Sequence, residues 1–434
     1  MSTYQAAEFV QSATLTDTPE EVTEQVRTRV LDTLAAITAG YRQEGVDIAR
    51  EYATTHCNGQ SSLPRASLLD GSNTTIAAEG AALANGVAAN ALDIDDGHRE
   101  VKGHPAAVVV PPALAAAEAV DASIGEFLDA VFIGYELAVR TGLAIHATDD
   151  VYTGTGSWGA LGAAAAVSRL LDLKQEQTAH ALSVAEYHAP RTPIMRGVEN
   201  PAMTKDGVGW SAHTGYVAAQ LAAAGFTGSK TIFDVSDALE TLGDRFHVTR
   251  GYLKPYPCCR WAQPGVEAVL TLTDEQSIPP EHVETIRVST FEEATHLRTR
   301  TPASPEEAQY SYPYPVAAAL VRGQFTQTEH TTAVRTDPEV LALTERVDLV
   351  VDDDIDARFP SECLARVDIE TPSKTYSSPV TRARGSRESP LSKTAQLQKA
   401  RRLVVPTLSS TVVSDSVEQL TDPSVPVSRL TTLW

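Results

Sequence analysis

The sequence predicts a mainly α-helical protein that carries a smaller α+β domain. Helical periodicity prevails up to about residue 264, whereas alternating strand patterns occur only between residues 265 and 391. The chain has 434 residues, which is too many for one ordinary hydrophobic core. We therefore predict a large all-helical domain from residues 1–264 and 392–434, and an α+β domain from residues 265–391.

The first helix is predicted to begin near Thr18 and to end at Gly40. Thr18 can cap it, Pro19 suits its first turn, and apolar residues then recur at helical spacing. A capping-box pattern from Ser123 to Glu126 predicts a second helix, to about residue 143. Further helices are predicted over residues 75–120, with a break at 93–105, and over residues 159–171, 175–185 and 210–224.

Period-two patterns predict half-buried strands over residues 284–291, 346–351 and 363–371. In the first of these, Ile286, Val288 and Thr290 share one face. Helices are predicted between the strands, over residues 311–321 and 338–345. We expect the tail from about Leu391 to return to the helical domain.

The net charge of −21 comes from 35 basic and 56 acidic residues. Nucleic-acid binding needs a basic surface, so this balance argues against such a partner. Only eight of the basic residues are lysines. An acidic, lysine-poor surface suggests a halophilic protein, and an acidic protein of a GC-rich genome is the alternative. The remaining lysines should then have specific roles, above all Lys205 and Lys254 in non-periodic segments.

Nothing in the sequence predicts a secretory leader or a membrane span, because the start lacks a basic segment and an apolar segment. The apolar stretches are interrupted by Gly, Pro or charged residues. Four cysteines in a chain of this length are not a disulfide framework. We therefore expect a cytoplasmic protein.

The most polar loop lies between two apolar helices, over residues 91–105. It contains Asp93, Asp95, Asp96, His98, Glu100, Lys102 and His104. Such a loop is a candidate site, although a solvated loop with capping aspartates is the alternative. Its spacing matches neither an EF-hand nor a paired-histidine helix, so we predict no metal. His104 stands where the chain enters an apolar run, which suits general acid/base chemistry.

Two further segments carry positive charge. Lys205 precedes a glycine-rich helix start, where the helix N–H groups and the lysine could hold an anion together, unless it is a surface lysine. Lys254 and Arg260 frame a segment with two prolines and two cysteines, and both suit carboxylate recognition. A catalytic thiol at Cys258 or Cys259 has no histidine partner motif, which favours structural cysteines.

A tyrosine-rich segment over residues 309–315 opens a predicted helix. Tyrosines in such a pattern are usually core or interface residues. Tyr314 could instead donate a proton or a hydrogen bond to a ligand.

These segments, in this order and spacing, resemble the MmgE/PrpD family along nearly the whole chain. The residues that carry the resemblance are Asn85-Gly86, the loop at 93–105, residues 154–166, Thr204-Lys205, residues 222–228, 254–260 and 309–314, Arg384-Gly385 and Pro390-Leu391-Ser392. The resemblance implies a helical domain with an inserted α+β domain, and a homodimer. It also implies chemistry beside a carboxylate of a small polycarboxylate substrate, without a metal or an organic cofactor. The family includes 2-methylcitrate dehydratase, cis-aconitate decarboxylase and iminodisuccinate epimerase.

The resemblance also assigns roles to residues of this chain. His104 would be the general acid/base, and Asp93 would orient it or contact the substrate. Lys205 and Lys254 would bind carboxylates, one of them acting as a base. The remaining candidates are Tyr314 as a donor and Arg260 as a carboxylate ligand.

Two positions depart from the family pattern. Many relatives carry histidines where this chain has Thr153, with Tyr152 beside it, and Gln263. We take Tyr152 and Thr153 as substrate-binding candidates. The departures weaken cis-aconitate decarboxylation most. They somewhat favour a two-base epimerisation that would use, for example, Lys205 together with Tyr152 or His104. We expect a hydro-lyase of the 2-methylcitrate dehydratase type; the alternatives are an epimerase of an imino- or amino-dicarboxylate, a decarboxylase, a metal-dependent hydrolase and a non-catalytic ligand-binding relative.

Overall fold

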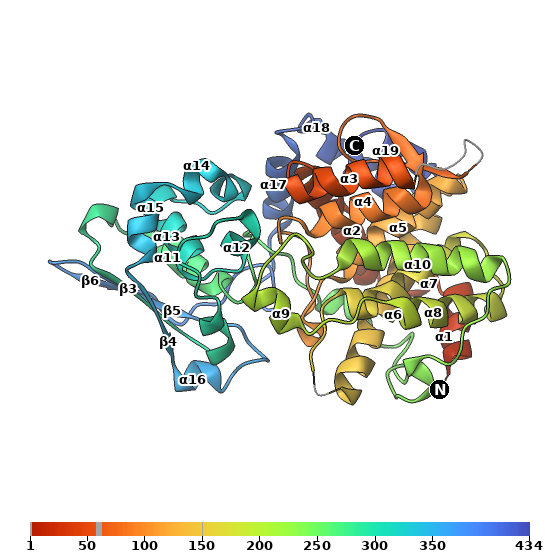
Figure 1. Cartoon of the computed structure of the whole chain (residues 1–434), viewed down its shortest axis with the longest axis horizontal. Helices are drawn as coiled ribbons and strands as arrows, with labels where there is room; N and C mark the ends of the chain where they lie inside the picture. The colour runs from red at the N-terminus through yellow and green to blue at the C-terminus, as the bar shows by residue number, and fades with distance from the viewer. Residues whose placement is uncertain (1, 58–62, 150) are drawn as a thin grey trace.

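A computed structural model describes residues 2–57, 63–149 and 151–434, and shows a large helical lobe beside a smaller lobe that contains a sheet (Figure 1). The helices of the larger lobe are α1 (Thr3–Ser12), α2 (Glu20–Gly40), α3 (Glu44–His56), α4 (Ala78–Asn90), α5 (Pro105–Ala119), α6 (Ile124–Thr148), α7 (Gly156–Leu170), α8 (Gln175–His188) and α10 (Val208–Ala223), joined by α17 (Lys393–Val404), α18 (Thr411–Thr421) and α19 (Val427–Thr431). The short helix α9 (Ile194–Glu199) lies between the lobes and contributes Val198 to the core of the smaller one. This arrangement confirms the predicted fold class.

Helices α5 and α7 form the centre of the helical lobe, and both are buried over most of their length. Small residues allow the helices to approach closely. At the crossing of α6 and α7, a Cβ atom on Gly162 would lie 2.4 Å from the carbonyl oxygen of Gly134. This contact leaves no space for a side chain, so it fixes the position of α7, whose first turn faces the polar loop.

The smaller lobe contains a four-stranded mixed sheet in the order β4-β3-β5-β6. Its strands are β3 (Thr285–Thr290), β4 (Val347–Val351), β5 (Arg366–Glu370) and β6 (Thr375–Ser377), and its helices are α11 (Gln263–Glu275), α12 (Pro305–Gln309), α13 (Pro313–Arg322), α14 (Thr332–Arg335), α15 (Pro338–Thr344) and α16 (Asp353–Asp356). Strand β3 pairs with β4 in parallel and with β5 antiparallel, so Ile286 is flanked by Val347 and Ile369. All three are buried, and they build a second hydrophobic core together with α11 and α13.

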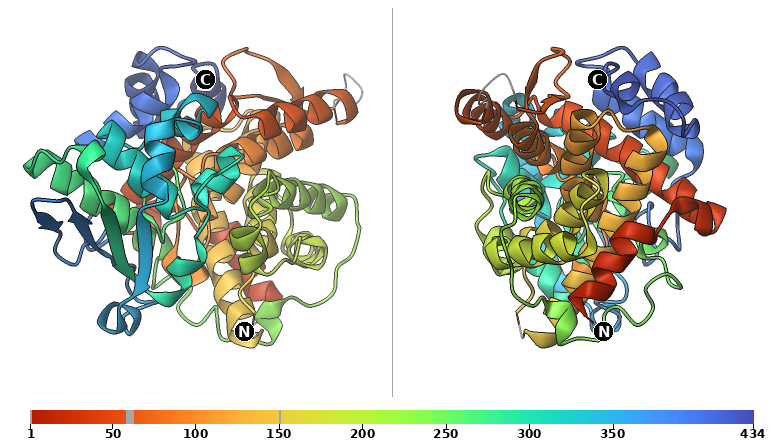
Figure 2. Two further views of the ribbon diagram at one scale, coloured as in Figure 1. Left: turned by 60° about the vertical axis from the view of Figure 1, so that its left-hand side comes forward. Right: turned by 90° about the vertical axis from the view of Figure 1, so that its right-hand side faces the viewer.

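The C-terminal helices return to the larger lobe, as the sequence predicts. Figure 2 shows them in blue against the N-terminal part of the chain. Helix α17 packs on α2, and the buried Lys399 joins the two elements through an ion pair of 2.6 Å between its Nζ and Oδ1 of Asp32. The same ammonium donates to the carbonyl oxygen of Ile94, 2.7 Å away, and so ties the tail to the polar loop.

Some predicted boundaries are wrong. Thr18 does not cap α2, because it closes the preceding turn by donating from its hydroxyl to the carbonyl oxygen of Leu15. Helices α7 and α10 begin at Gly156 and Val208, before the predicted residues, and β5 is shorter than the predicted strand. The hairpin of β1 (Arg65–Ser67) and β2 (Thr75–Ala77) was not predicted.

The predicted division at residues 264/265 and 391/392 stays a prediction. The hydrophobic core of the smaller lobe already includes residues 256–262, a few positions before that boundary. No helix among the described residues combines the length and the hydropathy needed to cross a membrane.

The glycine contact between α6 and α7 gives a stability prediction. We expect Gly162→Ala to lower the free energy of unfolding by about 1–3 kcal/mol, because the new methyl group must push the two helix backbones apart. Gly197 on α9 is the matched control, since a Cβ there would meet no atom closer than 3.9 Å. Gly197→Ala should leave stability unchanged or raise it by ~0.5–1 kcal/mol. Denaturant unfolding checks both variants, and equal stability of the two would contradict the close contact.

Candidate active site

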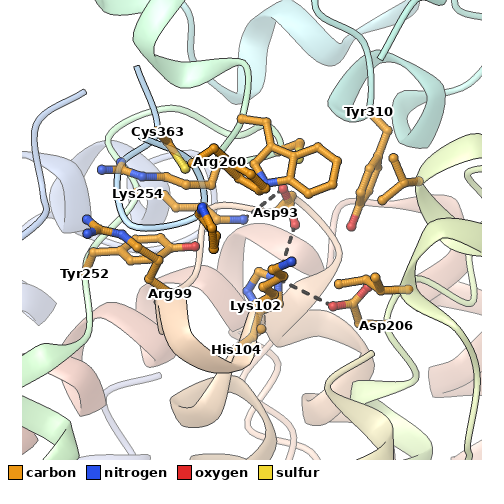
Figure 3. A pocket seen from close by; sticks show the side chains of 17 residues that line it. Asp93, Arg99, Lys102, His104, Asp206, Tyr252, Lys254, Arg260, Tyr310 and Cys363 are labelled. Carbon is orange, nitrogen blue, oxygen red and sulfur yellow. Dashed lines mark ion pairs between the residues drawn. The ribbon is translucent and has the colours of Figure 1, made fainter. Parts of the chain in front are cut away.

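The polar loop lies at the junction of the two lobes and lines a cavity. Residues from both lobes surround it: Asp93, Arg99, Lys102, His104, Asp206, Tyr252, Lys254, Cys259, Arg260, Tyr310 and Cys363 are among its lining residues (Figure 3). Asp93, Asp95 and Asp96 follow the end of α4, and each is at most 1% exposed. His104 precedes α5 and is 6% exposed, which places it where the chain enters the core.

Asp93 is the centre of this site. Its Oδ2 lies 2.8 Å from Nζ of Lys254, and its Oδ1 lies 3.7 Å from Nζ of Lys205 and 3.7 Å from Nε2 of His104. Figure 3 shows Lys254 and His104 directed toward it. Burial opposes the charge of this carboxyl group, but Lys254, Lys205 and His104 hold its pKa well below the ordinary value. The group is therefore a permanent carboxylate, already neutralised by the protein.

The two lysines are engaged with Asp93. Burial favours the neutral amine of Lys254, but Asp93 outweighs this effect and raises the pKa, so Lys254 stays cationic and is a poor base. Lys205 donates a hydrogen bond to the side-chain oxygen of Gln309, and its ammonium lies 4.8 Å from the ring centroid of Tyr310. Gln309 donates in turn to the carbonyl oxygen of Ala91, 3.0 Å away, and so links the loop to α12. Lys205 does not line the cavity.

His104 is held by its Nδ1 atom. This nitrogen lies 2.8 Å from Oδ2 of Asp95 and 2.9 Å from the carbonyl oxygen of Asp96. Asn90, the last residue of α4, donates to both oxygens of Asp95 and fixes that carboxylate. Asp95 is thus the orienting residue, a role that the sequence suggested for Asp93.

The other nitrogen of His104 is directed toward the cavity. Its Nε2 lies 3.8 Å from Oδ2 of Asp206, and Asp206 accepts a hydrogen bond of 3.1 Å from Oγ1 of Thr155. Burial lowers the pKa of the imidazole, but Asp95 and Asp93 outweigh this effect and raise it above its ordinary value of 6.5. The two carboxylates therefore favour the cationic form of His104, which is the form that can donate a proton.

Arg260 is buried without a carboxylate partner among the described residues. Its guanidinium donates to Oε1 of Gln263 at 2.9 Å and to the carbonyl oxygens of Ala383 and Arg384 at 3.2 Å each. It also lies 4.6 Å from the ring centroid of Tyr252. Gln263 donates to two backbone carbonyls beside it. Gln263 therefore positions Arg260 at the cavity.

Besides Lys205, three more predicted residues do not line this cavity. The hydroxyl of Tyr314 donates to the carbonyl oxygen of Glu329, and its ring packs in the smaller core. Tyr310, from the same tyrosine-rich segment, lines the cavity instead. Tyr152 lies over the Lys102 ammonium, 3.6 Å from ring centroid to Nζ. The backbone nitrogen of Thr153 donates to Nε2 of His146 at 3.3 Å.

The cysteines and the metal alternative can be judged from their surroundings. Burial raises the pKa of Cys258 and Cys259, which keeps both as thiols and disfavours nucleophilic catalysis. Asp93, Asp95 and His104 offer three ligand atoms within 4.8 Å of one another. The two ammonium groups beside Asp93 would repel a divalent cation, so this arrangement favours an ion-paired cluster over a metal centre.

No role was predicted from the sequence for five residues of the cavity and its surroundings, namely Asp95, Lys102, Asp206, Tyr252 and Tyr310. For three of them, the position in the sequence could have indicated a place in the site. Asp95 and Lys102 belong to the polar loop already chosen, and Asp206 follows Lys205 directly. Nothing in the local sequence marks Tyr252 as a residue of the cavity.

Among curated proteins, the chain has distant relatives that are named as cis-aconitate decarboxylases or as similar to them. The chain is 26% identical over 284 residues to cis-aconitate decarboxylase of Aspergillus terreus, and this alignment covers 59% of this chain and 57% of that enzyme. It is 24% identical over 357 residues to the human cis-aconitate decarboxylase, covering 76% and 72%. A cis-aconitate decarboxylase-like protein of Aspergillus oryzae is 31% identical over 176 residues, covering 38% and 36%. The alignments thus span less than two thirds of either fungal relative.

Family models cover nearly all of the sequence. The model of the MmgE/PrpD N-terminal domain matches residues 4–241, and that of the C-terminal domain matches residues 256–421. The first match alone includes the polar loop and Lys205, and the second includes Arg260 and Tyr310. The chain belongs to the MmgE/PrpD family.

Proposed function

We propose that this protein is a lyase that decarboxylates a small tricarboxylate, with His104 as the proton donor. The observation that carries this proposal is the arrangement of His104. Asp95 binds one of its nitrogens and favours the imidazolium, while the other nitrogen is directed toward the cavity. An acid of this kind is poised to protonate a carbon or an oxygen of a bound substrate.

The charge distribution supports a polycarboxylate substrate. Arg260 and Lys102 both line the cavity, and no carboxylate lies within ion-pair distance of either among the described residues. Arg260 is buried, whereas Lys102 is partly buried. A buried cation without a counter-ion is costly, and an anionic ligand would remove this cost at Arg260. Arg260 suits carboxylates particularly well, because its planar guanidinium can donate two parallel hydrogen bonds.

The cavity offers acids more readily than bases, which favours decarboxylation. Lys254 is cationic, Asp93 is neutralised by cations, and burial keeps Tyr310 and Cys259 protonated by raising their pKa values. In a decarboxylation, the bond to one carboxylate breaks and CO₂ leaves. The electron pair of the broken bond stays on the substrate and is delocalised toward another of its carboxylates, where fixed cations stabilise the negative charge. Nε2 of His104 then donates a proton to the substrate carbon. The names of the relatives in fungi and man agree with this reaction.

Dehydration of a 2-methylcitrate-like substrate is the second candidate. This reaction needs a base as well as an acid. Two carboxylates line the cavity, Asp93 and Asp206. Among the described residues, no lysine or arginine lies within ion-pair distance of Asp206, which is therefore the candidate base beside His104. The epimerase alternative receives less support, because Tyr152 lies outside the cavity and Lys205 does not line it. We also propose a cytoplasmic homodimer, on the ground of family resemblance.

The first prediction from this proposed function concerns the reaction product. We expect the protein, assayed at high salt in deuterium oxide, to convert cis-aconitate into CO₂ and a dicarboxylate with one new carbon–deuterium bond, as followed by proton NMR. Parallel reactions contain 2-methylcitrate and amino-dicarboxylates. Water loss without CO₂ would favour dehydration over decarboxylation, and solvent exchange without net reaction would favour epimerisation. No turnover of any polycarboxylate would contradict the lyase assignment.

The second prediction uses the pKa of His104. A proton donor acts in its protonated form, so kcat/KM should fall as pH rises through the raised pKa, at a pH above 6.5. Asp95→Asn removes the largest interaction that raises this pKa, and should move the alkaline limb down by about one pH unit or more. His104→Gln should lose the limb and reduce kcat by about 10²–10⁴-fold.

The matched control for Asp95→Asn is Asp149→Asn, at a carboxylate on the surface that pairs with Arg191. It should leave the pH profile unchanged. Thermal unfolding of each variant verifies that the protein stays folded over the pH range used. An alkaline limb that Asp95→Asn leaves in place would show that His104 is not the titrating acid.

The third prediction tests the metal alternative at Asp93, Asp95 and His104. Dialysis against a strong chelator should leave the activity unchanged, because Lys254 and Lys205 supply the positive charge beside Asp93. Added Zn²⁺ or Mn²⁺ should not increase it. Loss of activity on chelation, with recovery on addition of one metal, would contradict the ion-paired interpretation of this cluster.

A further inference from the structure

Lys102 occupies an unusual position between two cavities. It follows the short 3-10 helix η2 (Arg99–Val101), and its φ of 47° lies in the left-handed region, which is unfavourable for a lysine. Together with Arg99, Tyr252 and Pro360, it lines both the active-site cavity and a neighbouring cavity, so these residues form the partition between them. The backbone therefore holds a strained conformation that brings an ammonium group to this partition.

The ammonium of Lys102 is surrounded by rings and lacks an anionic partner. Its Nζ lies 3.6 Å from the ring centroid of Tyr152 and 5.4 Å from that of Phe359. No carboxylate lies within ion-pair distance of it among the described residues, and Glu293 acts on its charge only from beyond that distance. Arg99, in the same partition, already pairs with Glu388 at 3.3 Å. The aromatic faces hold the charge in place without neutralising it, which leaves it available to an anion.

The two cavities show where that anion would lie. Lys102 and Arg99 line both of them, so their charges can be reached from the side of His104 and from the neighbouring cavity. A tricarboxylate whose reacting carbon lies at His104 can therefore extend another of its carboxylates to the partition.

We propose that Lys102 binds this extended carboxylate and thereby selects substrates with three carboxylates over those with two. The inference rests on the proposed function and adds a specificity-determining residue to it. Tyr152 then has a different role from the predicted one, since it positions the ammonium of Lys102 rather than contacting the substrate. The alternative is a structural lysine, whose contacts with Tyr152 and Phe359 stabilise the loop alone.

The test compares two probes that differ by one carboxylate, propane-1,2,3-tricarboxylate and glutarate. Titration calorimetry at one fixed salt concentration measures the affinity of each probe for the wild type, Lys102→Gln, Lys102→Arg and the exposed control Lys230→Gln. We expect the wild type to prefer the tricarboxylate by about tenfold or more, since charge-assisted hydrogen bonds are strong. Lys102→Gln should weaken tricarboxylate binding by about 10–100-fold and change glutarate binding by less than about threefold. Lys102→Arg should keep most of the preference, and Lys230→Gln should keep all of it.

Each outcome separates the two roles of Lys102. Equal weakening of both probes in Lys102→Gln, together with a lower melting temperature, would show a structural lysine and overturn the inference. An unchanged preference in Lys102→Gln, or a wild type that binds both probes equally, would also overturn it and leave the lyase proposal intact. A wild type that binds neither probe and no other polycarboxylate would contradict the proposed function itself.

Discussion

The buried carboxylate of Asp93 is the interaction on which the rest of the site depends. Three segments far apart in the sequence bring Lys254, Lys205 and His104 to its two oxygens. Without this carboxylate, buried cations would face each other in a medium that screens charge poorly. The ion-paired cluster therefore joins the polar loop, the start of α10 and the segment that leads into the smaller lobe.

This cluster divides the cations of the site into two groups. Lys254 and Lys205 are engaged by Asp93, so their charges serve mainly to hold the structure together. Arg260 and Lys102 are held by neutral groups, namely backbone carbonyls, an amide and aromatic rings. Because neutral groups orient a cation without cancelling its charge, the second group is the one that can attract an anionic substrate on an acidic protein.

The scarcity of lysine was an informative feature of the sequence. It directed attention to Lys205 and Lys254, and the structure places both in one buried cluster. The same reasoning would have selected Lys102 and Lys399, since neither lies on an open surface. Lys102 was marked only as a member of the polar loop. The sequence did not separate Lys399 from the surface lysines, because the burial of its segment depends on distant parts of the chain.

The sequence by itself determined the fold class, several of the longer helices, three strands of the sheet and the polar loop that lines the cavity. Periodicity, capping patterns and the polar loop are local properties, and they are visible without a partner segment. Only the tertiary structure decided that Tyr310 rather than Tyr314 lines the cavity, that Asp95 orients His104, and that Gln263 positions Arg260. These outcomes depend on side-chain directions, which are set when helices and strands from distant parts of the chain pack together and determine which partners each polar group can reach.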